Sequence, residues 1–269
     1  MKAIILAAGK GTRLRPLTYG IPKPLLPLRG KPILDWVIRS ITKEDFIDEV
    51  FVGISGSNGV DFYDRILSHT HGICIDSYIQ NVNYGVPVST IPTTQRETAG
   101  DLLHILQEKN IKTGEIMVVY GDNLTEFNVG DMINYHRNCR KKLSISATIL
   151  LFEAPEKQVN RFGIANVEQN SGFTLIKSFI EKPKGNVSSR LANGGYYIIE
   201  VGDIINTFPK DKIKVEESIF PILAKKGKLS GFVSKLPFWL DISTLESYEE
   251  ANKMVYDGLI IPPPITNER

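Results

Sequence analysis

Residues 3–16 read AIILAAGKGTRLRP, a short apolar run that breaks into a glycine-rich, positively charged loop. An apolar run ending in such a loop predicts a buried strand that leads into a turn of an α/β sheet. The glycines let the backbone approach a ligand closely and turn N–H groups toward it. Arg13 adds a rigid fork of donors that matches phosphate oxygens. The stretch therefore indicates an α/β protein that binds a phosphorylated small molecule, first of all a nucleotide.

The spacing of this loop excludes two common phosphate-binding loops. A Walker loop needs Ser or Thr directly after Gly-Lys, and no Gly-Lys of this chain is followed by either. A dinucleotide-binding loop needs a third glycine where this chain has Leu14. The alternative interpretation is a tight strand–helix turn without a ligand. The cations Arg13, Arg15 and Lys23, which cluster just downstream, favour the phosphate interpretation.

The composition is that of an ordinary globular protein, and it limits the class of function. Of the 269 residues, 42% are hydrophobic and 23% are charged, which suits one large domain or a domain with a lobe. The net charge of +2 gives no nucleic-acid or membrane footprint, and no apolar run is long enough to span a bilayer. Cys74 and Cys139 have neither disulfide nor metal spacing. We therefore expect a cytoplasmic protein without nucleic-acid or membrane partners.

Apolar periodicity predicts alternating strands and helices in the first half of the chain and a strand-rich second half. The expected strands are 3–7, 49–54, 72–79, 115–120, 142–152, 162–167, 173–181, 193–200 and 229–236. The expected helices are 33–42, 60–69, 98–108, 129–141, 202–207, 215–226 and 244–256. The alternation predicts a Rossmann-like, doubly wound α/β sheet, to which the second half adds a β-rich lobe that makes the sheet mixed.

Further short motifs follow the opening stretch in order along the chain. They are Pro22–Pro27 (PKPLLP), Thr98–Gly100 (TAG), Gly121–Asn123 (GDN), Phe162–Ile164 (FGI), Glu181–Pro183 (EKP), Asn193–Tyr197 (NGGYY) and Trp239–Ile242 (WLDI). Together with residues 6–14, they resemble the sugar-1-phosphate nucleotidylyltransferase family, also called nucleotide-sugar pyrophosphorylases. The similarity covers about residues 2–255.

The resemblance implies a reaction in which a nucleoside triphosphate and a sugar 1-phosphate give a nucleotide-diphospho sugar and pyrophosphate. It implies one nucleotidylyltransferase domain over 1–256, with a nucleotide-binding half (about 1–141) and a sugar-binding half (about 142–240). Residues 257–269 form a proline-rich tail, and we expect no C-terminal β-helix domain of the kind that some relatives carry. The expected partners are a nucleoside triphosphate and a sugar 1-phosphate, and a homo-oligomer is compatible with the family resemblance.

The residue chemistry fits this reaction without reference to the family. A phosphate oxygen is ionised at neutral pH, so the nucleophile needs no general base, and the chain shows no Ser/His/Asp or Cys/His arrangement. The reaction does need in-line positioning, and it needs cations that offset the repulsion between two anions and the charge on the departing pyrophosphate. We therefore expect basic side chains and Mg²⁺ at the site.

Two aspartates are the expected Mg²⁺ ligands. Asp122 follows the apolar run 116–120, so we expect its carboxylate at the C-terminal edge of a strand, where ligands bind in open α/β sheets. Asp241 follows residues 238–240 in a similar context. Taken alone, Asp122 fits a turn and Asp241 fits a helix start. Because they match the two metal positions of the family, the resemblance implies that the pair holds the ion.

The resemblance also implies roles for residues around the nucleotide. Arg13 and Lys23 are the expected catalytic residues: Arg13 faces the β- and γ-phosphates, and Lys23 faces the phosphate charge near the reacting phosphorus. A solvated surface lysine is the alternative for Lys23. The expected nucleotide-binding residues are Leu6, Ala7, Ala8, Gly9, Gly11, Thr12, Arg13, Thr98, Ala99 and Gly100.

Four residues of the second half form the expected sugar-phosphate site. The resemblance implies that Glu181 accepts hydrogen bonds from sugar hydroxyls and that Lys182 holds the sugar phosphate. Gly163, through its backbone, and Asn193 complete the pocket. An exposed ion pair at a strand end is the alternative for Glu181 and Lys182.

The chain departs from the family beside the expected base pocket, where Glu97 replaces the usual glycine before Thr98-Ala99-Gly100. The base is therefore open. Glucose 1-phosphate with dTTP or UTP is the first interpretation, and mannose 1-phosphate with GTP is the second. A cytidylyltransferase acting on a non-sugar phosphate and a catalytically silent, nucleotide-sugar-binding regulatory subunit are further alternatives.

Overall fold

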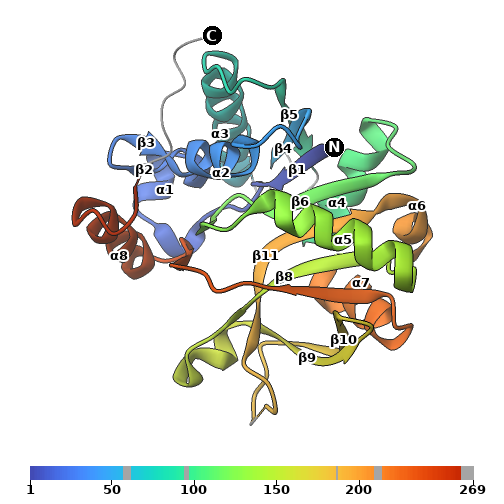
Figure 1. The fold of residues 1–269 in the computed structure, drawn as a ribbon. Helices are drawn as coiled ribbons and strands as arrows, with labels where there is room; N and C mark the ends of the chain where they lie inside the picture. The colour runs from blue at the N-terminus through green and yellow to red at the C-terminus, as the bar shows by residue number, and fades with distance from the viewer. Residues whose placement is uncertain (57–61, 94–96, 186, 209–213, 262–269) are drawn as a thin grey trace. The chain divides into compact units, whose positions relative to one another are not determined.

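The computed structural model describes residues 1–56, 62–93, 97–185, 187–208 and 214–261, and the chain forms two compact units (Figure 1). The first unit comprises residues 1–95, 119–126 and 238–269, and the second comprises residues 96–118 and 127–237. The units are therefore interleaved along the chain. The division into nucleotide-binding and sugar-binding halves, which assumes consecutive segments, stays a prediction.

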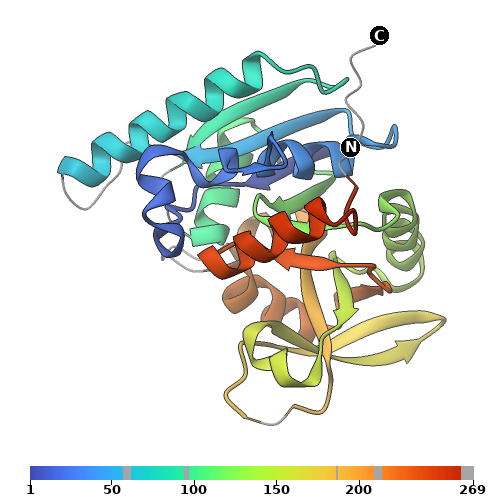
Figure 2. The same cartoon turned by 90° about the vertical axis from the view of Figure 1, so that its left-hand side faces the viewer.

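Parallel strands form the sheet of the first unit, in the order β5-β4-β1. β1 (Lys2–Leu6) pairs with β4 (Glu49–Ser55), and β4 pairs with β5 (Val88–Thr93). Buried runs of Val and Ile in β1 and β4 are typical of parallel strands. Helix α2 (Ile33–Thr42) buries an apolar stripe, and α3 (Phe62–Gln80) is the long cyan helix in Figure 2.

Short elements complete the first unit. Those after β1 are η1 (Thr12–Leu14), α1 (Leu17–Gly20), η2 (Lys23–Leu25), β2 (Pro27–Leu28) and β3 (Lys31–Pro32). The later segments add β7 (Asn123–Thr125), β13 (Trp239–Asp241) and α8 (Leu245–Tyr256). β7 and β13 are antiparallel, with Asp241 opposite Asn123. This pairing joins the two segments that carry the expected metal ligands.

The second unit contains a mixed sheet in the order β6-β11-β8-β12-β10-β9. All of β6 except its last two residues belongs to this unit. β8 and β12 are parallel, whereas the pairs β8–β11, β10–β12 and β9–β10 are antiparallel. The strands are β6 (Glu115–Tyr120), β8 (Ala147–Glu153), β9 (Gly163–Asn170), β10 (Phe173–Glu181), β11 (Leu191–Glu200) and β12 (Leu229–Val233). The helices are α4 (Glu97–Glu108), α5 (Val129–Leu143), η3 (Glu156–Arg161), α6 (Val201–Ile204), η4 (Ile205–Thr207) and α7 (Val215–Lys225).

The predicted hairpin of the β-rich lobe is present. β9 and β10 form the long yellow ribbon in Figure 2, with Gly163 opposite Glu181. Ser171 and Gly172 in its turn have φ angles of 51° and 82°, the left-handed conformation that turn residues such as glycine adopt readily. The predicted bounds of α2, β6 and β10 coincide with the structure.

The prediction of a strand over 72–79 is wrong, because these residues continue helix α3. The helix predicted over 60–69 is therefore longer in the structure and continues to Gln80. A Cβ built on Gly72 would lie 2.8 Å from the backbone oxygen of Ser55, so this glycine allows the helix to pack closely against the end of β4. On the side of β4 away from β1, the neighbouring strand is β5, which was not predicted.

The start of β8 was also predicted too early. Residues 142 and 143 belong to α5, and Ser144 ends that helix with a φ of 51° before the strand begins at Ala147. The basic residues Arg140, Lys141 and Lys142 in its last turn suit the negative end of the helix dipole.

Three general expectations concern the whole chain. Among the described residues, no helix combines the length and apolarity that crossing a bilayer requires. Cys74 is exposed and Cys139 is buried, and both are free thiols. Most of the expected proline-rich tail lies outside the described residues, which end at residue 261.

Candidate functional site

The glycine-rich loop is closely packed in the first unit. Gly11 precedes η1 with a φ of 63°, and a Cβ there would lie 2.9 Å from Thr18 Cγ2 and 3.1 Å from Lys23 Cβ. The hydroxyl of Thr18, which is buried, donates to the backbone oxygen of Gly11 at 2.8 Å. The left-handed backbone and the lack of space both require glycine at this position. The loop is therefore held in one conformation by its own packing.

Two expected metal ligands and one expected catalytic lysine lie together in this unit. The backbone N–H of Ile242 donates to the backbone oxygen of Asp122 at 3.0 Å, which brings the start of β7 and the end of β13 together. Lys23 Nζ donates to and forms an ion pair with Asp122 Oδ2. Ser243 Oγ donates to Asp241 Oδ2 at 2.8 Å. The helix η2, the start of β7 and the end of β13 thus present an ammonium group and two carboxylates close to one another.

The charges around Asp241 show how closely these groups interact. Burial, and then the negative charge of Asp122, raise the pKa of Asp241 above its ordinary value. The hydrogen bond from Ser243 and the positive charges of Lys23 and Arg13 act in the opposite direction. A partly buried carboxylate whose ionisation is disfavoured by a neighbouring carboxylate forms a site that a cation would stabilise.

The remaining residues of the first unit that are expected to bind the nucleotide lie at the end of β1, in the loop after it and in η1. The backbone of Ala7 donates to Gly53 in β4, and a Cβ on Gly121 would meet Ala7 Cβ at 2.9 Å. Gly9 is exposed and has open space around it. A pocket beside the loop is lined by Gly9, Lys10, Lys23 and, from α3, Ser68 and His71, among others. The two α3 residues were not predicted as part of a site.

The expected residues Thr98, Ala99 and Gly100 lie in the second unit, in the first turn of α4. Thr98 Oγ1 accepts the backbone N–H of Val215 at 3.0 Å and donates to Glu216 Oε2 at 3.4 Å. Its hydroxyl is therefore engaged with α7. Glu97, which replaces the usual family glycine, has a φ of 57°. A left-handed backbone at this position accounts for the glycine that the family resemblance implies.

We expect Glu97→Gly to unfold at a higher denaturant concentration than Glu97→Ala. Both variants lose the same carboxylate at the start of α4, but only glycine adopts a φ of 57° without steric cost. The difference should be about 1 kcal/mol in the free energy of unfolding. Urea denaturation followed by far-UV circular dichroism measures it. An Ala variant as stable as the Gly variant would contradict the assignment of strain to Glu97.

The four expected sugar-phosphate residues also lie in the second unit. A Cβ on Gly163 would lie 2.4 Å from Phe179 Cζ and 2.8 Å from Glu181 Oε2, so Gly163 leaves room for both side chains. Lys182 Nζ lies 3.7 Å from Glu181 Oε1. Asn193 Nδ2 donates to Tyr197 Oη at 2.8 Å, and Asn193 Oδ1 accepts the N–H of Gly195 at 2.9 Å.

Burial and nearby charges shift the pKa of Glu181. Its pKa is raised above the ordinary value by burial first and then by the negative charge of Glu216, while Lys182 and Lys214 lower it. Lys182, the residue before Pro183, has a φ of 45°, a conformation that a lysine rarely adopts. Its N–H donates to the backbone oxygen of Phe162 at 3.0 Å. Backbone strain of this kind is common where a side chain is held for binding.

Gly163→Ala should lower the free energy of unfolding by about 1–3 kcal/mol, because the new methyl group overpacks the buried ring of Phe179 and displaces Glu181. Urea denaturation measures the loss. Gly185→Ala is the matched control, since Gly185 is exposed and a Cβ there meets no atom within 4 Å. Equal stability of the two variants would show that Gly163 is not packed as described.

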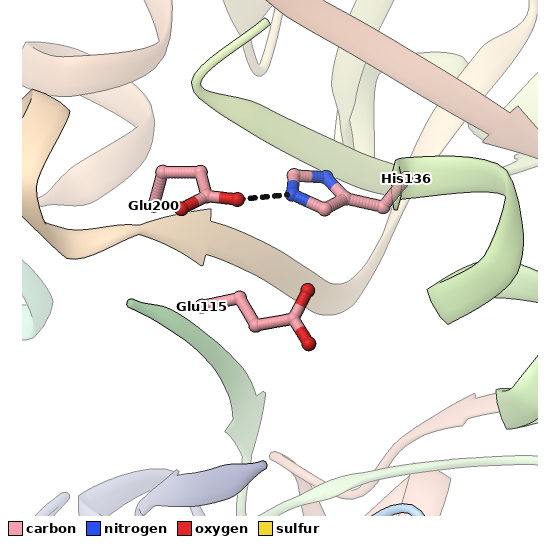
Figure 3. Close-up of side chains that lie close together, drawn as sticks. All are labelled: Glu115, His136 and Glu200. Atoms are coloured by element: carbon pink, nitrogen blue, oxygen red, sulfur yellow. Dashed lines mark hydrogen bonds and ion pairs between the residues drawn. The ribbon is translucent and has the colours of Figure 1, made fainter. Parts of the chain in front are cut away.

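A second cluster with metal-ligand side chains lies elsewhere in the second unit and was not predicted. One ligand atom each from Glu115, His136 and Glu200 lies within 4.8 Å of the others (Figure 3). His136 Nε2 is 3.2 Å from Glu200 Oε1. Arg137 Nε donates to Glu115 at 2.9 Å, and Arg140 Nε lies 3.0 Å from Glu200. Because each carboxylate already has a guanidinium partner, we interpret this cluster as a structural ion network.

Several residues of these sites escaped the sequence analysis. Thr18 and Ser243 act through single hydroxyls, for which no spacing pattern exists. Glu216 had a usable signal, since it falls on the apolar stripe of its helix, four and seven residues before Phe220 and Leu223. A carboxylate at such a position is buried and must be paired.

The amino-acid sequence of this chain is similar to those of known nucleotidyl transferases. The profile of a family described as "Nucleotidyl transferase" matches residues 2–258. The "Probable glucose-1-phosphate cytidylyltransferase" of Bacillus subtilis is 32% identical over 266 residues, which cover 96% of this chain and 97% of that protein. The mannose-1-phosphate guanyltransferase beta-B of Xenopus laevis is 30% identical over 90% of this chain, and the match spans 61% of its length.

A solved structure supports the fold. UDP-glucose pyrophosphorylase complexed with UDP-glucose superposes with a TM-score of 0.74 at 20% sequence identity, over 96% of this chain and 98% of that chain. The predicted fold class, a Rossmann-like α/β fold with a mixed sheet, is therefore confirmed. The resemblance derived from the sequence motifs is confirmed as well.

Proposed function

This chain belongs to the nucleotidyl transferase family, and we propose that it is a sugar-1-phosphate nucleotidylyltransferase acting on a hexose 1-phosphate. In this reaction an oxygen of the sugar phosphate attacks the α-phosphorus of a nucleoside triphosphate. The bond from the α-phosphorus to the bridging oxygen breaks, and pyrophosphate leaves with the electron pair. No proton has to be removed from the nucleophile, which agrees with the lack of a catalytic base among the predicted site residues.

The observation that carries this proposal is the pair of carboxylates Asp122 and Asp241 beside Lys23 and within electrostatic reach of Arg13. Hard oxygen ligands whose charges repel each other fit Mg²⁺, so these two side chains would hold the ion. Bound there, Mg²⁺ supplies positive charge to triphosphate oxygens. Because the family generally depends on a metal ion, the test of function includes the removal of Mg²⁺ with EDTA.

The cationic side chains of the first unit have separate roles in the proposal. Arg13 offers a planar fork to the β- and γ-phosphates and stabilises charge on the departing pyrophosphate. Lys23, which already neutralises Asp122, is placed to balance charge at the reacting phosphate. The packed backbone around Gly11 holds the loop N–H groups in place for the triphosphate.

In the second unit, Lys182 would bind the sugar phosphate and Glu181 would accept hydrogen bonds from sugar hydroxyls. Asn193 adds an amide whose orientation is fixed by Gly195 and Tyr197. Gly163 keeps the space that Glu181 needs. An anionic carboxylate and a fixed amide select a ligand rich in hydroxyl groups, which favours a sugar over a phosphate without hydroxyls.

Glucose 1-phosphate with a pyrimidine nucleoside triphosphate is the substrate pair that we propose. The relative matched over nearly its whole length is named for glucose 1-phosphate and cytidylyl transfer, which adds CTP to dTTP and UTP as candidates. Mannose 1-phosphate with GTP is the second candidate, because a guanyltransferase is 30% identical, although the match spans only 61% of that protein.

Pyrophosphate release tests the function directly. The purified chain is incubated with Mg²⁺, each of five nucleoside triphosphates, and a panel of hexose 1-phosphates that includes glucose and mannose. One strongly preferred pair that loses activity with EDTA supports the proposal and identifies base and sugar. Release without any sugar phosphate requirement, or no release from a folded protein that binds nucleotide, overturns it, and the second outcome favours a silent regulatory subunit.

A further inference from the structure

Glu216, in the first turn of α7, is a buried carboxylate that neither the motifs nor the proposed mechanism uses. Its residue surface is 4% exposed. Burying an ionised carboxylate costs free energy unless hydrogen bonds compensate it, so its partners are informative. These partners lead to two of the predicted substrate-binding segments.

A directed chain of hydrogen bonds runs from Glu216 to Asn193. Tyr197 Oη donates its single proton to Glu216 Oε1 at 3.0 Å. The phenol oxygen is then an acceptor, and Asn193 Nδ2 donates to it at 2.8 Å. Because the N–H of Gly195 donates to Asn193 Oδ1 at 2.9 Å, the orientation of the amide is fixed at both ends.

The other carboxylate oxygen reaches the start of α4. Thr98 Oγ1 donates to Glu216 Oε2 at 3.4 Å, and it accepts the N–H of Val215 at 3.0 Å. This contact is longer than the one to Tyr197, so it is the weaker of the two. Figure 1 shows α4, α7 and β11, the elements that carry these residues.

We propose that Glu216 is a positioning residue for sugar-phosphate recognition: acting through Tyr197, its carboxylate fixes the Asn193 amide without touching substrate. The inference rests on the proposed function, in which Asn193 binds the sugar. A residue without a side-chain acceptor at position 216, such as leucine, could accept neither from Tyr197 nor from Thr98. The Tyr197 hydroxyl would then be free to turn its proton toward Asn193, where two donors would face each other.

Glu216 also acts on Glu181 through its charge. The ionisable groups that influence Glu181 are Glu216, Glu217 and Lys214 from α7 and its neighbour Lys182. After burial, the charge of Glu216 is the main cause that raises the pKa of Glu181. Removing this charge should lower the pKa of Glu181, so that its carboxylate stays ionised to lower pH.

The test compares Glu216→Leu, which removes both acceptor oxygens, Tyr197→Phe and the double variant with the wild-type chain. Each single change should raise the KM for the sugar 1-phosphate about tenfold or more, as expected for a lost hydrogen bond to a charged group. The KM for the nucleoside triphosphate should change much less, because the contact to Thr98 is long. The KM of the double variant for the sugar 1-phosphate should be no higher than the higher of the two single-variant values, because both changes break the same chain of hydrogen bonds.

Two further measurements separate positioning from general destabilisation. In Glu216→Leu, the acid limb of kcat/KM for the sugar 1-phosphate should move to lower pH, whereas a merely structural role would leave it in place. Glu217→Leu removes a charge one residue along, from a side chain that is 45% exposed, and should keep the wild-type KM. Thermal unfolding identifies any variant that fails to fold, in which case Tyr197→Phe carries the test.

The outcomes distinguish the two proposals. If the wild-type chain turns over its substrates and Glu216→Leu and Tyr197→Phe keep its KM values, the positioning role is overturned and the proposed function stands. Strictly additive effects in the double variant would also overturn it. If the wild-type chain releases no pyrophosphate and calorimetry detects no binding of glucose 1-phosphate or mannose 1-phosphate, the proposed function itself fails.

Discussion

Asp241→Asn is expected to lower kcat by roughly 10²–10³-fold or more, the loss typical when one preorganised electrostatic group is removed from an active site. Asn keeps the shape of the side chain and one acceptor oxygen for Ser243 Oγ. It removes the negative charge that, with Asp122, would attract Mg²⁺. Steady-state pyrophosphate release at saturating substrates measures the effect, and raising the Mg²⁺ concentration should restore part of the activity.

The same variant should fold at least as well as the wild-type chain. Burial and Asp122 raise the pKa of Asp241, so its ionised form costs stability at neutral pH, and a neutral residue removes that cost. Thermal unfolding without Mg²⁺ checks this expectation. Asp257→Asn, an exposed position after α8, is the matched control and should keep full activity. Wild-type turnover in Asp241→Asn would remove Asp241 from the proposed metal site.

The features that could be predicted from sequence are those fixed by local chemistry. The run 3–16 specifies a buried strand and a glycine turn, and the structure has β1 followed by Gly11 in a left-handed conformation. Asp122 follows an apolar run, and it lies at the end of β6. In both cases neighbouring residues determine the conformation, so periodicity and turn chemistry are sufficient.

The features that escaped prediction depend on contacts between distant segments. Gly72 is a helix breaker by propensity, yet it lies within α3, at a position where the backbone oxygen of Ser55 leaves no room for a side chain. The pairing of β7 with β13 joins residues more than a hundred positions apart, and no local pattern encodes it. The partners of Glu216 likewise come from two other elements of the second unit. Tertiary packing overrides propensity in the first case and sets the geometry in the others.

Lys182→Ala is expected to raise the KM for the sugar 1-phosphate by roughly 10–100-fold, the range for losing a charge-assisted hydrogen bond to an anion. The KM for the nucleoside triphosphate should change little, since the residues proposed for the triphosphate belong to other segments. The backbone supports a specific role: a lysine with a φ of 45° before a proline is held there by its N–H bond to Phe162.

The side chain of Lys182 is 56% exposed and 3.7 Å from Glu181, so alanine should alter stability little, and the kinetic change would report binding. Lys184→Ala, two residues further and also exposed, removes the same charge outside the motif and should keep both KM values. Kinetics with each substrate varied in turn at a saturating level of the other separate the two constants. Equal increases in both KM values would place Lys182 outside the sugar-phosphate site. They would also remove the strongest argument that its strained backbone serves binding.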